Sequence, residues 1–379
     1  MSYKAFTKQV AILEQKPYIS GSRYSMRANM LVRQNVWHSN REKPKGIHRK
    51  TNENLKCNKH STKMSSQSVK KITTAINWMV AAAKNKWIPA TATRSAFQFK
   101  INFITLTLSS TGTCINAENF HSKMLQPFID NARANWGLNL YVAKIEYQKN
   151  GNPHAHIVTD TYLDHYKVRT YWNKLQAKVG TMDGYLAKHV GCSFAKYLEM
   201  HPPTIYCDAA KSYERWVAGK KSNWASPNSI DVHSVRNVRD MAAYLCSYMT
   251  KDIVADDMPS ELKTLLSAKS TARMWSCSAI LSKQFKKSYI IEGKRHDYWS
   301  ETLKVATIPI AQIMGLPNKW GTSYPIAEVC YLRLGDWFNN CKGILREIYL
   351  GTILELQNAK KSLEVVKSIV SPVPSFALN

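Results

Sequence analysis

A twenty-residue segment from Tyr141, YVAKIEYQKNGNPHAHIVTD, constrains the fold more than any other part of the sequence. Its two arms are rich in apolar and aromatic residues, and they flank the turn signal NGN at residues 150–152. This pattern is typical of two antiparallel strands joined by a tight connection. The segment therefore predicts a β-hairpin.

The second arm of this hairpin carries a pair of histidines, His154 and His156. Because successive side chains of a strand point to opposite faces, residues two apart share a face, and both imidazoles can ligate one metal ion. Surface or structural histidines explain an isolated pair of this kind equally well. A metal site is favoured over these alternatives only if other residues complete the ligand set.

Glu146 on the first arm is the candidate third ligand. It shares the face of the histidines if it lies opposite His156, because directly opposed residues of an antiparallel pair point to the same side. This pairing predicts Lys149 opposite Pro153 and a three-residue connection at 150–152. A two-residue Asn-Gly turn would instead direct the carboxylate to the other face.

The segment SIDVHSVRNVRDMAAYLCSYMTKD, which begins at Ser229, predicts a short strand followed by a helix. On that helix Tyr244, Tyr248 and Lys251 recur at steps of four and three residues, so they occupy one stripe. Aromatic residues at helical spacing usually pack in a core. A lysine on the same stripe argues against that interpretation and for two phenols and an amine that face one site.

Other segments extend the α+β pattern. Apolar residues at steps of three and four predict an amphipathic helix over 69–83, and a second helix fits 117–135. Between them, apolar and aromatic residues alternate from Phe97 and lead into ITLTL at Ile104. That alternation, rich in β-branched side chains, predicts a central strand.

Charge points to the class of partner. The chain has 53 Lys and Arg against 26 Asp and Glu, a formal net charge of +27, which favours a polyanion such as nucleic acid. Residues 1–100 hold 20 of the basic residues and only 3 acidic ones. The stretch 18–64 is polar, basic and poor in apolar anchors, so we expect a flexible basic arm that grips phosphates or is merely solvated.

The cysteines and the apolar segments indicate the cellular compartment in which the protein works. The 8 cysteines form no CxxC pair, so neither a zinc ribbon nor a disulfide framework is indicated, and a reducing cytoplasm fits best. No apolar run is long enough for a membrane span, and charged residues interrupt the first 20 positions. We therefore expect a soluble protein that is not exported and has no membrane partner.

In this order the motifs resemble the HUH superfamily of replication initiators, and more closely the Rep proteins of single-stranded DNA bacteriophages and related circular elements. The resemblance covers residues 97–280. Its motifs are FITLT from Phe103, IEYQKNGNPHAHIVTD from Ile145, Trp172-Asn173, NSIDVHS from Asn228, AAYLCSYMTK from Ala242 and RMWSCS from Arg273. It implies an HUH endonuclease domain of the α+β class. In this ferredoxin-like (RRM-like) fold helices flank a five-stranded antiparallel sheet, the histidine strand is central and the tyrosine helix docks across from it.

The resemblance also implies a chemistry. Glu146, His154 and His156 would hold Mg²⁺ or Mn²⁺, and a tyrosine would attack single-stranded DNA at a replication origin. The products are a 5′-phosphotyrosine and a free 3′-hydroxyl, which a host DNA polymerase extends in the cytoplasm of a host, expected to be bacterial. Because the sequence contains no GxxxxGK[ST] motif, strand separation falls to a host helicase.

One departure from the family pattern orders the two tyrosines. Relatives with paired tyrosines commonly place lysine three residues after each one. Here Ser247 stands in that position for Tyr244, whereas Tyr248 keeps Lys251. This asymmetry favours Tyr248 for the first cut, with Tyr244 attacking when the replicated circle is released.

Further residues carry two interpretations. Aromatic residues interleave with basic ones between 206 and 224, and they either clamp unpaired bases or form a packed helix with a solvated basic face. The members are Tyr206, Lys211, Tyr213, Arg215, Trp216, Lys220, Lys221 and Trp224. His233, Asp231 and Lys188-His189 are weaker candidates for metal or DNA contacts than for core or supporting roles.

We expect four regions: a basic flexible arm over 1–64, an amphipathic helix and linker over 65–96, the HUH endonuclease domain over 97–280, and a mainly helical extension over 281–379. Two other functions stay open. A relaxase or transposase of the same superfamily is disfavoured by the order and doubling of the tyrosines. A non-enzymatic single-stranded DNA-binding protein is allowed by charge and aromatic content alone.

Overall fold

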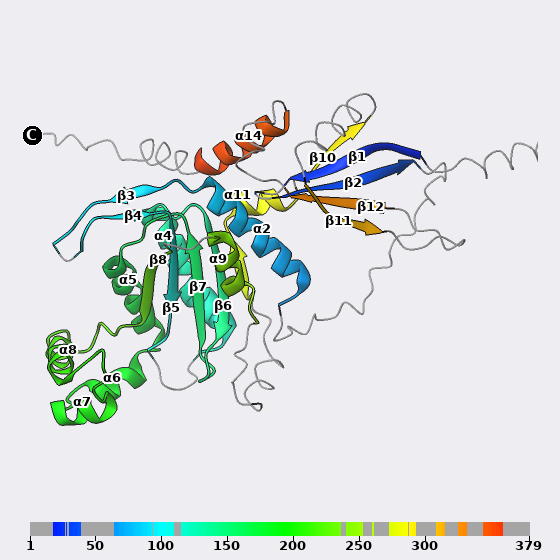
Figure 1. The fold of residues 1–379 in the computed structure, drawn as a ribbon. Helices are drawn as coiled ribbons and strands as arrows, with labels where there is room; N and C mark the ends of the chain where they lie inside the picture. Colours follow the sequence, from blue (N-terminus) through cyan, green and yellow to red (C-terminus); the bar gives the residue numbers. More distant parts are fainter. Residues whose placement is uncertain are drawn as a thin grey trace, which may run out of the picture. The chain divides into compact units, whose positions relative to one another are not determined.

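The computed structural model describes residues 18–26, 28, 30–38, 64–92, 94–109, 115–235, 240–252, 260, 273–286, 288–292, 308–314, 325–331 and 344–358. The chain divides into two compact units (Figure 1). One unit consists of residues 57–282 together with 355–379, and the other of residues 1–56 together with 283–354. The candidate site lies in the first of these units.

The first unit is built on a five-stranded antiparallel sheet in the order β8-β5-β7-β6-β9. The strands are β5 (Ile101–Leu106), β6 (Tyr141–Tyr147), β7 (Pro153–Thr159), β8 (Ile230–Val235) and β9 (Trp275–Cys277). The strand that carries the histidine pair, β7, is the middle one. The expected α+β fold with five antiparallel strands and flanking helices is confirmed.

The predicted strand after Phe97 is divided in two. Residues of β4 (Phe97–Phe99) pair with β3 (Lys86–Ile88) in a small separate sheet, and the chain enters the main sheet only at Ile101. From there β5 is flanked on both sides, by β8 and by β7. Its odd and even residues therefore face opposite layers of the domain.

One face of the sheet forms the hydrophobic core. Even-numbered residues of β5, such as Ile104 and Leu106, pack with buried aromatic rings such as Phe128 and Trp172. The helical segments on this side are α3 (Ala117–Phe120), η1 (His121–Leu125), α4 (Gln126–Trp136) and α5 (His165–Val179). Gly137 ends α4 in the left-handed conformation, at φ 71°, which glycine adopts without a steric penalty.

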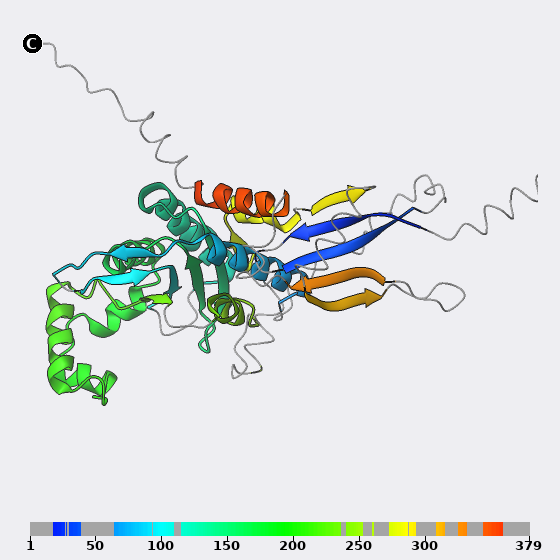
Figure 2. The same cartoon turned by 45° about the horizontal axis from the view of Figure 1, so that its top comes forward.

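The opposite face carries the predicted tyrosine helix, α9 (Met241–Met249), which packs against the amphipathic helix α2 (Ser66–Ala82). Figures 1 and 2 show α9 on the other side of the sheet from α4. Asp240 caps the start of α9, because its side chain accepts a hydrogen bond from the backbone N–H of Ala243. Residues of β5 that point away from the core, such as Phe103, face this helix.

Three short helices connect α5 to β8: α6 (Asp183–His189), α7 (Phe194–Met200) and α8 (Ala209–Lys221). They project from the sheet as a separate small group (Figure 2).

No helix in the part of the chain that the structure describes is both long and apolar enough to cross a membrane.

The second unit corrects two expectations. Residues 18–38, predicted as part of a flexible arm, form β1 (Tyr18–Met26) and β2 (Met30–His38). The predicted mainly helical extension contributes β10 (Ser288–Glu292), β11 (Ile308–Met314) and β12 (Pro325–Tyr331), although α14 (Ile344–Asn358) is helical. Together the strands form an antiparallel sheet in the order β10-β1-β2-β12-β11.

The average composition of residues 18–64 concealed these strands. Nine-residue runs such as MLVRQNVWH do contain β-branched and aromatic residues, but a polar and basic stretch follows and dominates the average. β1 and β2 pair with each other, but their other partners, β10 and β12, lie more than 200 positions away in the sequence, so no local pattern reveals the complete sheet. Residues 1–17 and 39–63 of the expected arm lie outside the described residues.

Candidate metal centre and tyrosine site

The β6–β7 hairpin brings the three predicted metal ligands to one face, but in a different register from the predicted one. Glu146 lies opposite His154, and Lys144, not Glu146, lies opposite His156. The prediction that Glu146 pairs with His156 is therefore wrong by two residues. The shift preserves the shared face, because side-chain direction repeats every two residues.

A glycine explains the shift. Gly151 has φ 80°, and its N–H donates to the carbonyl of Gln148 over 2.8 Å, while Gln148 N–H donates to the carbonyl of Asn152 over 2.9 Å. The connection is thus Lys149–Gly151, a three-residue loop whose last position is left-handed and favours glycine. The predicted loop at 150–152 would have put Asn152 at that position. An odd loop was expected and is found.

The three ligand side chains meet closely. The Nε2 atoms of His154 and His156 lie 2.9 Å and 2.7 Å from the same Glu146 oxygen, Oε1. In the part of the chain that the structure describes, these are the three histidine, cysteine or acidic side chains that lie close enough to hold one metal ion. Their potential ligand atoms all lie within 4.8 Å of one another. Two imidazoles and one carboxylate suit a divalent transition metal or Mg²⁺.

Hydrogen bonding orients one imidazole for metal binding. The Nδ1 atom of His156 lies 3.1 Å from Oγ1 of Thr105 on β5. A neutral His156 that carries its proton on Nε2 donates to Glu146, whereas one that carries it on Nδ1 donates to the Thr105 hydroxyl and keeps the Nε2 lone pair for a metal ion. Thr105 was not predicted from the sequence, because its role depends on the pairing of β5 with β7. The residues present therefore fit a metal ion.

A buried lysine that the sequence analysis missed stands beside the triad. Lys144 is completely buried, and its Nζ donates a hydrogen bond of 2.7 Å to Oε2 of Glu146. The same ammonium donates to the backbone carbonyl of Lys251 over 2.8 Å. The one available signal was position: Lys144 is two residues from Glu146 on the same strand face.

Burial and charge set the protonation of the triad. Burial raises the pKa of Glu146, but hydrogen bonds from His154 and His156 and the charge of Lys144 outweigh it and hold the pKa well below its usual range. Burial lowers the pKa of His156, and the Glu146 carboxylate only partly opposes this effect. Burial likewise lowers the pKa of Lys144. Near neutral pH the site holds an anionic carboxylate and a neutral His156 imidazole.

Of the three residues predicted to form one helical stripe, Tyr244 and Tyr248 lie on α9, and Lys251 lies two residues beyond its end. The rings of Tyr244 and Tyr248 lie 5.0 Å apart between centroids, and Nζ of Lys251 lies 4.5 Å from the centroid of Tyr248. Tyr248 is 40% exposed, so its phenol is accessible to a substrate. A hydrogen bond with Tyr248 raises the pKa of Tyr244.

Phe103 joins the tyrosine helix to the metal ligands. Its ring centroid lies 5.8 Å from that of Tyr248, in an edge-to-face arrangement, and 5.2 Å from that of His156. Tyr248 is thus one ring away from the histidine pair, whereas no ring contact joins Tyr244 to Phe103 in the described structure. The centroid of His233 is 5.4 Å from that of Phe103, and its Nδ1 lies 3.2 Å from an Asp231 oxygen.

Comparison with known proteins agrees with this arrangement. Residues 101–253 match the model of a family described as replication-associated protein ORF2. The match spans the histidine hairpin and the tyrosine helix. No curated protein and no solved structure shows a significant match to the chain.

Proposed function

From the match of residues 101–253 to the replication-associated protein ORF2 family, we propose that the chain initiates rolling-circle replication by cutting single-stranded DNA. The observation that carries the proposal is the approach of Tyr248 to the Glu146, His154 and His156 triad across the single ring of Phe103. A nucleophile and a metal centre on the same side of the sheet can act on one phosphate.

Glu146, His154 and His156 would hold the divalent cation, and a cation bound there supplies positive charge that polarises the scissile phosphate. The phenol oxygen of Tyr248 forms a bond to phosphorus as the bond from phosphorus to the 3′ oxygen breaks. The phenol proton leaves to solvent, and a proton from solvent completes the 3′-hydroxyl. The number of phosphoester bonds is unchanged, so the same site can rejoin the strand.

Two contacts support Tyr248 as the first nucleophile. The ammonium of Lys251 lies over its ring and stabilises negative charge that develops on the phenol. The ring of Tyr248 also contacts that of Phe103 beside the histidine pair, whereas the described structure has no ring contact between Tyr244 and Phe103. In this proposal Tyr244 acts later, when the replicated circle is closed and released.

The fully replicated product requires host proteins. The proposed reaction leaves a 3′-hydroxyl, which a host DNA polymerase extends, and a host helicase separates the strands. Binding at an origin is expected to use single-stranded DNA, because the exposed phenol of Tyr248 reaches an unpaired backbone more easily than one held in a duplex.

Covalent capture tests the proposal. The full chain is incubated with a labelled single-stranded oligonucleotide library and Mn²⁺, with Mg²⁺ or with EDTA, and the products are separated by denaturing electrophoresis. We expect a labelled protein band that requires metal, and peptide mapping that assigns the DNA to Tyr248. Binding without any covalent band under either metal would overturn the nuclease and leave a single-stranded DNA-binding protein.

A further inference from the structure

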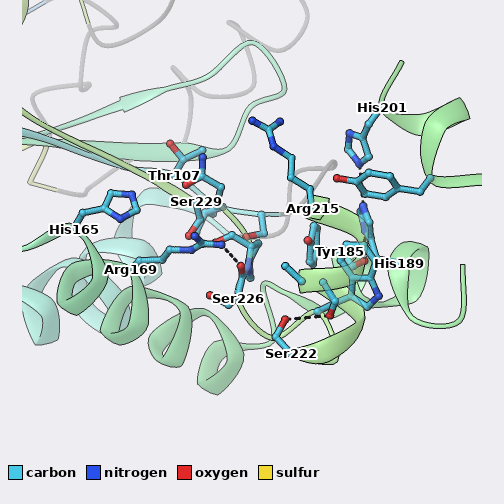
Figure 3. Close-up of a pocket in the computed structure, with 18 residues that line it drawn as sticks. Thr107, His165, Arg169, Tyr185, His189, His201, Arg215, Ser222, Ser226 and Ser229 are labelled. Atoms are coloured by element: carbon cyan, nitrogen blue, oxygen red, sulfur yellow. Dashed lines mark hydrogen bonds between the residues drawn. The ribbon is translucent and has the colours of Figure 1, made fainter. Parts of the chain in front are cut away.

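A second cavity, of about 890 Å³, lies between the end of β5, helix α5 and the helices α6 to α8 (Figure 3). Its lining includes two arginines and three histidines, Arg169, Arg215, His165, His189 and His201. No aspartate or glutamate is among the lining residues that the structure describes. A cavity with cationic side chains and no carboxylate favours an anionic ligand.

Packed rings form the outer wall of this cavity. His189 stacks on Tyr185 at 4.1 Å and on His201 at 5.4 Å between centroids, and it lies 4.9 Å from Trp224. His189 and Trp224 are buried, while His201 is exposed at the mouth. His201 also lies 4.7 Å from Tyr197 between centroids, so the exposed end of the wall is an imidazole ring beside which a flat, unsaturated group can pack.

Two arginines line the cavity, Arg215 beside the ring wall and Arg169 near Ser226 (Figure 3). Figure 3 shows the guanidinium of Arg215 extending between Thr107 and His201. Arg169 donates to the carbonyls of Pro227 and Ser226, so it is held by neutral groups and keeps its positive charge. Neither arginine forms an ion pair with an acidic residue in the described part of the chain. Arginines whose charge is not neutralised by a carboxylate bind phosphate oxygens.

The backbone is strained where it holds the ring wall. Asn223 and Trp224 have φ of 45° and 57°, and they are the non-glycine residues with positive φ in the described structure. Such conformations cost free energy and cluster at ligand-binding sites. The Trp224 indole fits because Gly219 has no side chain: a Cβ there would overlap Cζ3 of the indole.

The cavity adjoins the metal centre through β5. Thr107, at the edge of the cavity, follows two residues after Thr105, whose hydroxyl meets His156. The N–H of Thr107 donates to the carbonyl of Ser229, a second lining residue, over 2.8 Å. Two neighbouring threonines at the end of β5 thus reach the histidine pair and the edge of the cavity, respectively.

We propose that the cavity binds an unpaired nucleotide of the DNA strand that is cut, with its base stacked on the ring wall at His201 and its phosphate at Arg215. This inference rests on the proposed function, since it names the place where that site holds its substrate. It also selects between the two interpretations of the aromatic and basic segment 206–224. Of its members, Arg215 and Trp224 line the cavity, and the exposed ring of Tyr206 does not.

Binding is measured by fluorescence anisotropy, with the full chain carrying Tyr248→Phe so that no covalent product forms. The probes are a labelled dT 20-mer and a 20-mer of abasic units, whose affinity ratio reports contacts to bases. We expect His201→Ala to lower this ratio by roughly fivefold or more. Arg215→Gln should weaken both probes by roughly fivefold or more.

Two variants serve as matched controls. Lys196→Gln removes one positive charge from an exposed side chain of α7 outside the cavity, and Tyr206→Ala removes a ring that is 82% exposed. Both should change the affinities by less than about twofold. A reduced base ratio for Tyr206→Ala but not for His201→Ala would overturn the inference, and so would equal effects of Arg215→Gln and Lys196→Gln.

Free nucleotide is tested separately with thymidine 5′-phosphate. If it binds the parent more tightly than the dT 20-mer does, the cavity takes a free nucleotide and the inference is overturned. Covalent capture by the unmodified chain distinguishes the two proposals. If the adduct forms normally and the cavity variants bind DNA like the parent, only the cavity proposal is overturned. If no adduct forms, the proposal of a nuclease is overturned.

Discussion

The ammonium of Lys144 donates a hydrogen bond of 2.8 Å to the backbone carbonyl of Lys251, just beyond the tyrosine helix. The same ammonium holds Oε2 of Glu146 at 2.7 Å. One buried side chain thus ties the carboxylate of Glu146, the proposed metal ligand, to the end of the helix that carries Tyr248, the proposed nucleophile. We expect this tie to hold the tyrosine helix in place relative to the Glu146 carboxylate.

Lys144→Met should keep the buried volume and remove both hydrogen bonds. We expect the rate of adduct formation to fall roughly 10- to 100-fold, the range for loss of a partner that orients a metal ligand. Lys123→Met, at an exposed position on η1, should react like the unmodified chain. If both variants form the adduct at the same rate, Lys144 has no positioning role.

Glu146→Gln should impair metal binding directly, because the amide keeps the shape of the side chain but loses its charge. Mn²⁺ affinity, measured by calorimetry, should fall by more than the roughly 10- to 100-fold that loss of an orienting partner costs. Glu199→Gln makes the same chemical change at an exposed position of α7 and should leave the affinity unchanged. Equal affinities in the two variants would contradict the assignment of Glu146.

Metal affinity should depend on pH in a direction set by His156. Burial holds the pKa of His156 below 6.5, so the ring is neutral at higher pH and its Nε2 is free to bind metal. As pH falls below 6.5 and through the lowered pKa, protons compete for Nε2. We expect a constant Mn²⁺ affinity from about pH 8 to 6.5 and a decline below that range. A decline already complete above pH 7 would contradict this protonation state.

The two tyrosines should differ in single-turnover experiments. Tyr248→Phe should abolish the first cut of an oligonucleotide, because the phenol that approaches Phe103 and the triad is gone. Tyr244→Phe should cut normally and fail in the later transfer that releases a closed circle. Quantifying cut and rejoined strands on denaturing gels separates the steps, and the opposite pattern would reverse the order of attack.

Gly219→Ala should destabilise the unit that contains α8. The added methyl overlaps the Trp224 indole, so we expect the free energy of unfolding to fall by about 1–3 kcal/mol in urea titrations. Gly184→Ala is the matched control, because nothing lies within 4 Å of its added Cβ. That helical position should gain up to about 1 kcal/mol. A loss of stability in both variants would point to a general intolerance of the helices instead.

Period-two and helical patterns predicted the faces of the site correctly from the sequence. The histidine pair, Glu146 and the stripe of α9 lie where side-chain periodicity directs them, because periodicity depends only on residues close in the chain. The hairpin register was missed by two residues. It depends on which loop position needs a left-handed backbone, and Gly151 decides that.

Contacts between distant segments could not be read from the sequence. Lys144 meets the carbonyl of a residue 107 positions away, and Thr105 meets His156 across a strand pair. The two strands at 18–38 pair with each other and also with segments beyond residue 287, and that distant pairing cannot be read from their composition. Each of these features needs the three-dimensional arrangement to become visible.

The tie from Lys144 ends on a main-chain carbonyl, which every amino acid supplies. The side chain at 251 can therefore be replaced during evolution without releasing the tyrosine helix from the metal ligand. Position 144 lacks that freedom, because only a long cationic side chain spans both partners. Substitutions at position 251 can thus change the environment of the Tyr248 phenol, while Lys144 keeps the tyrosine helix in position.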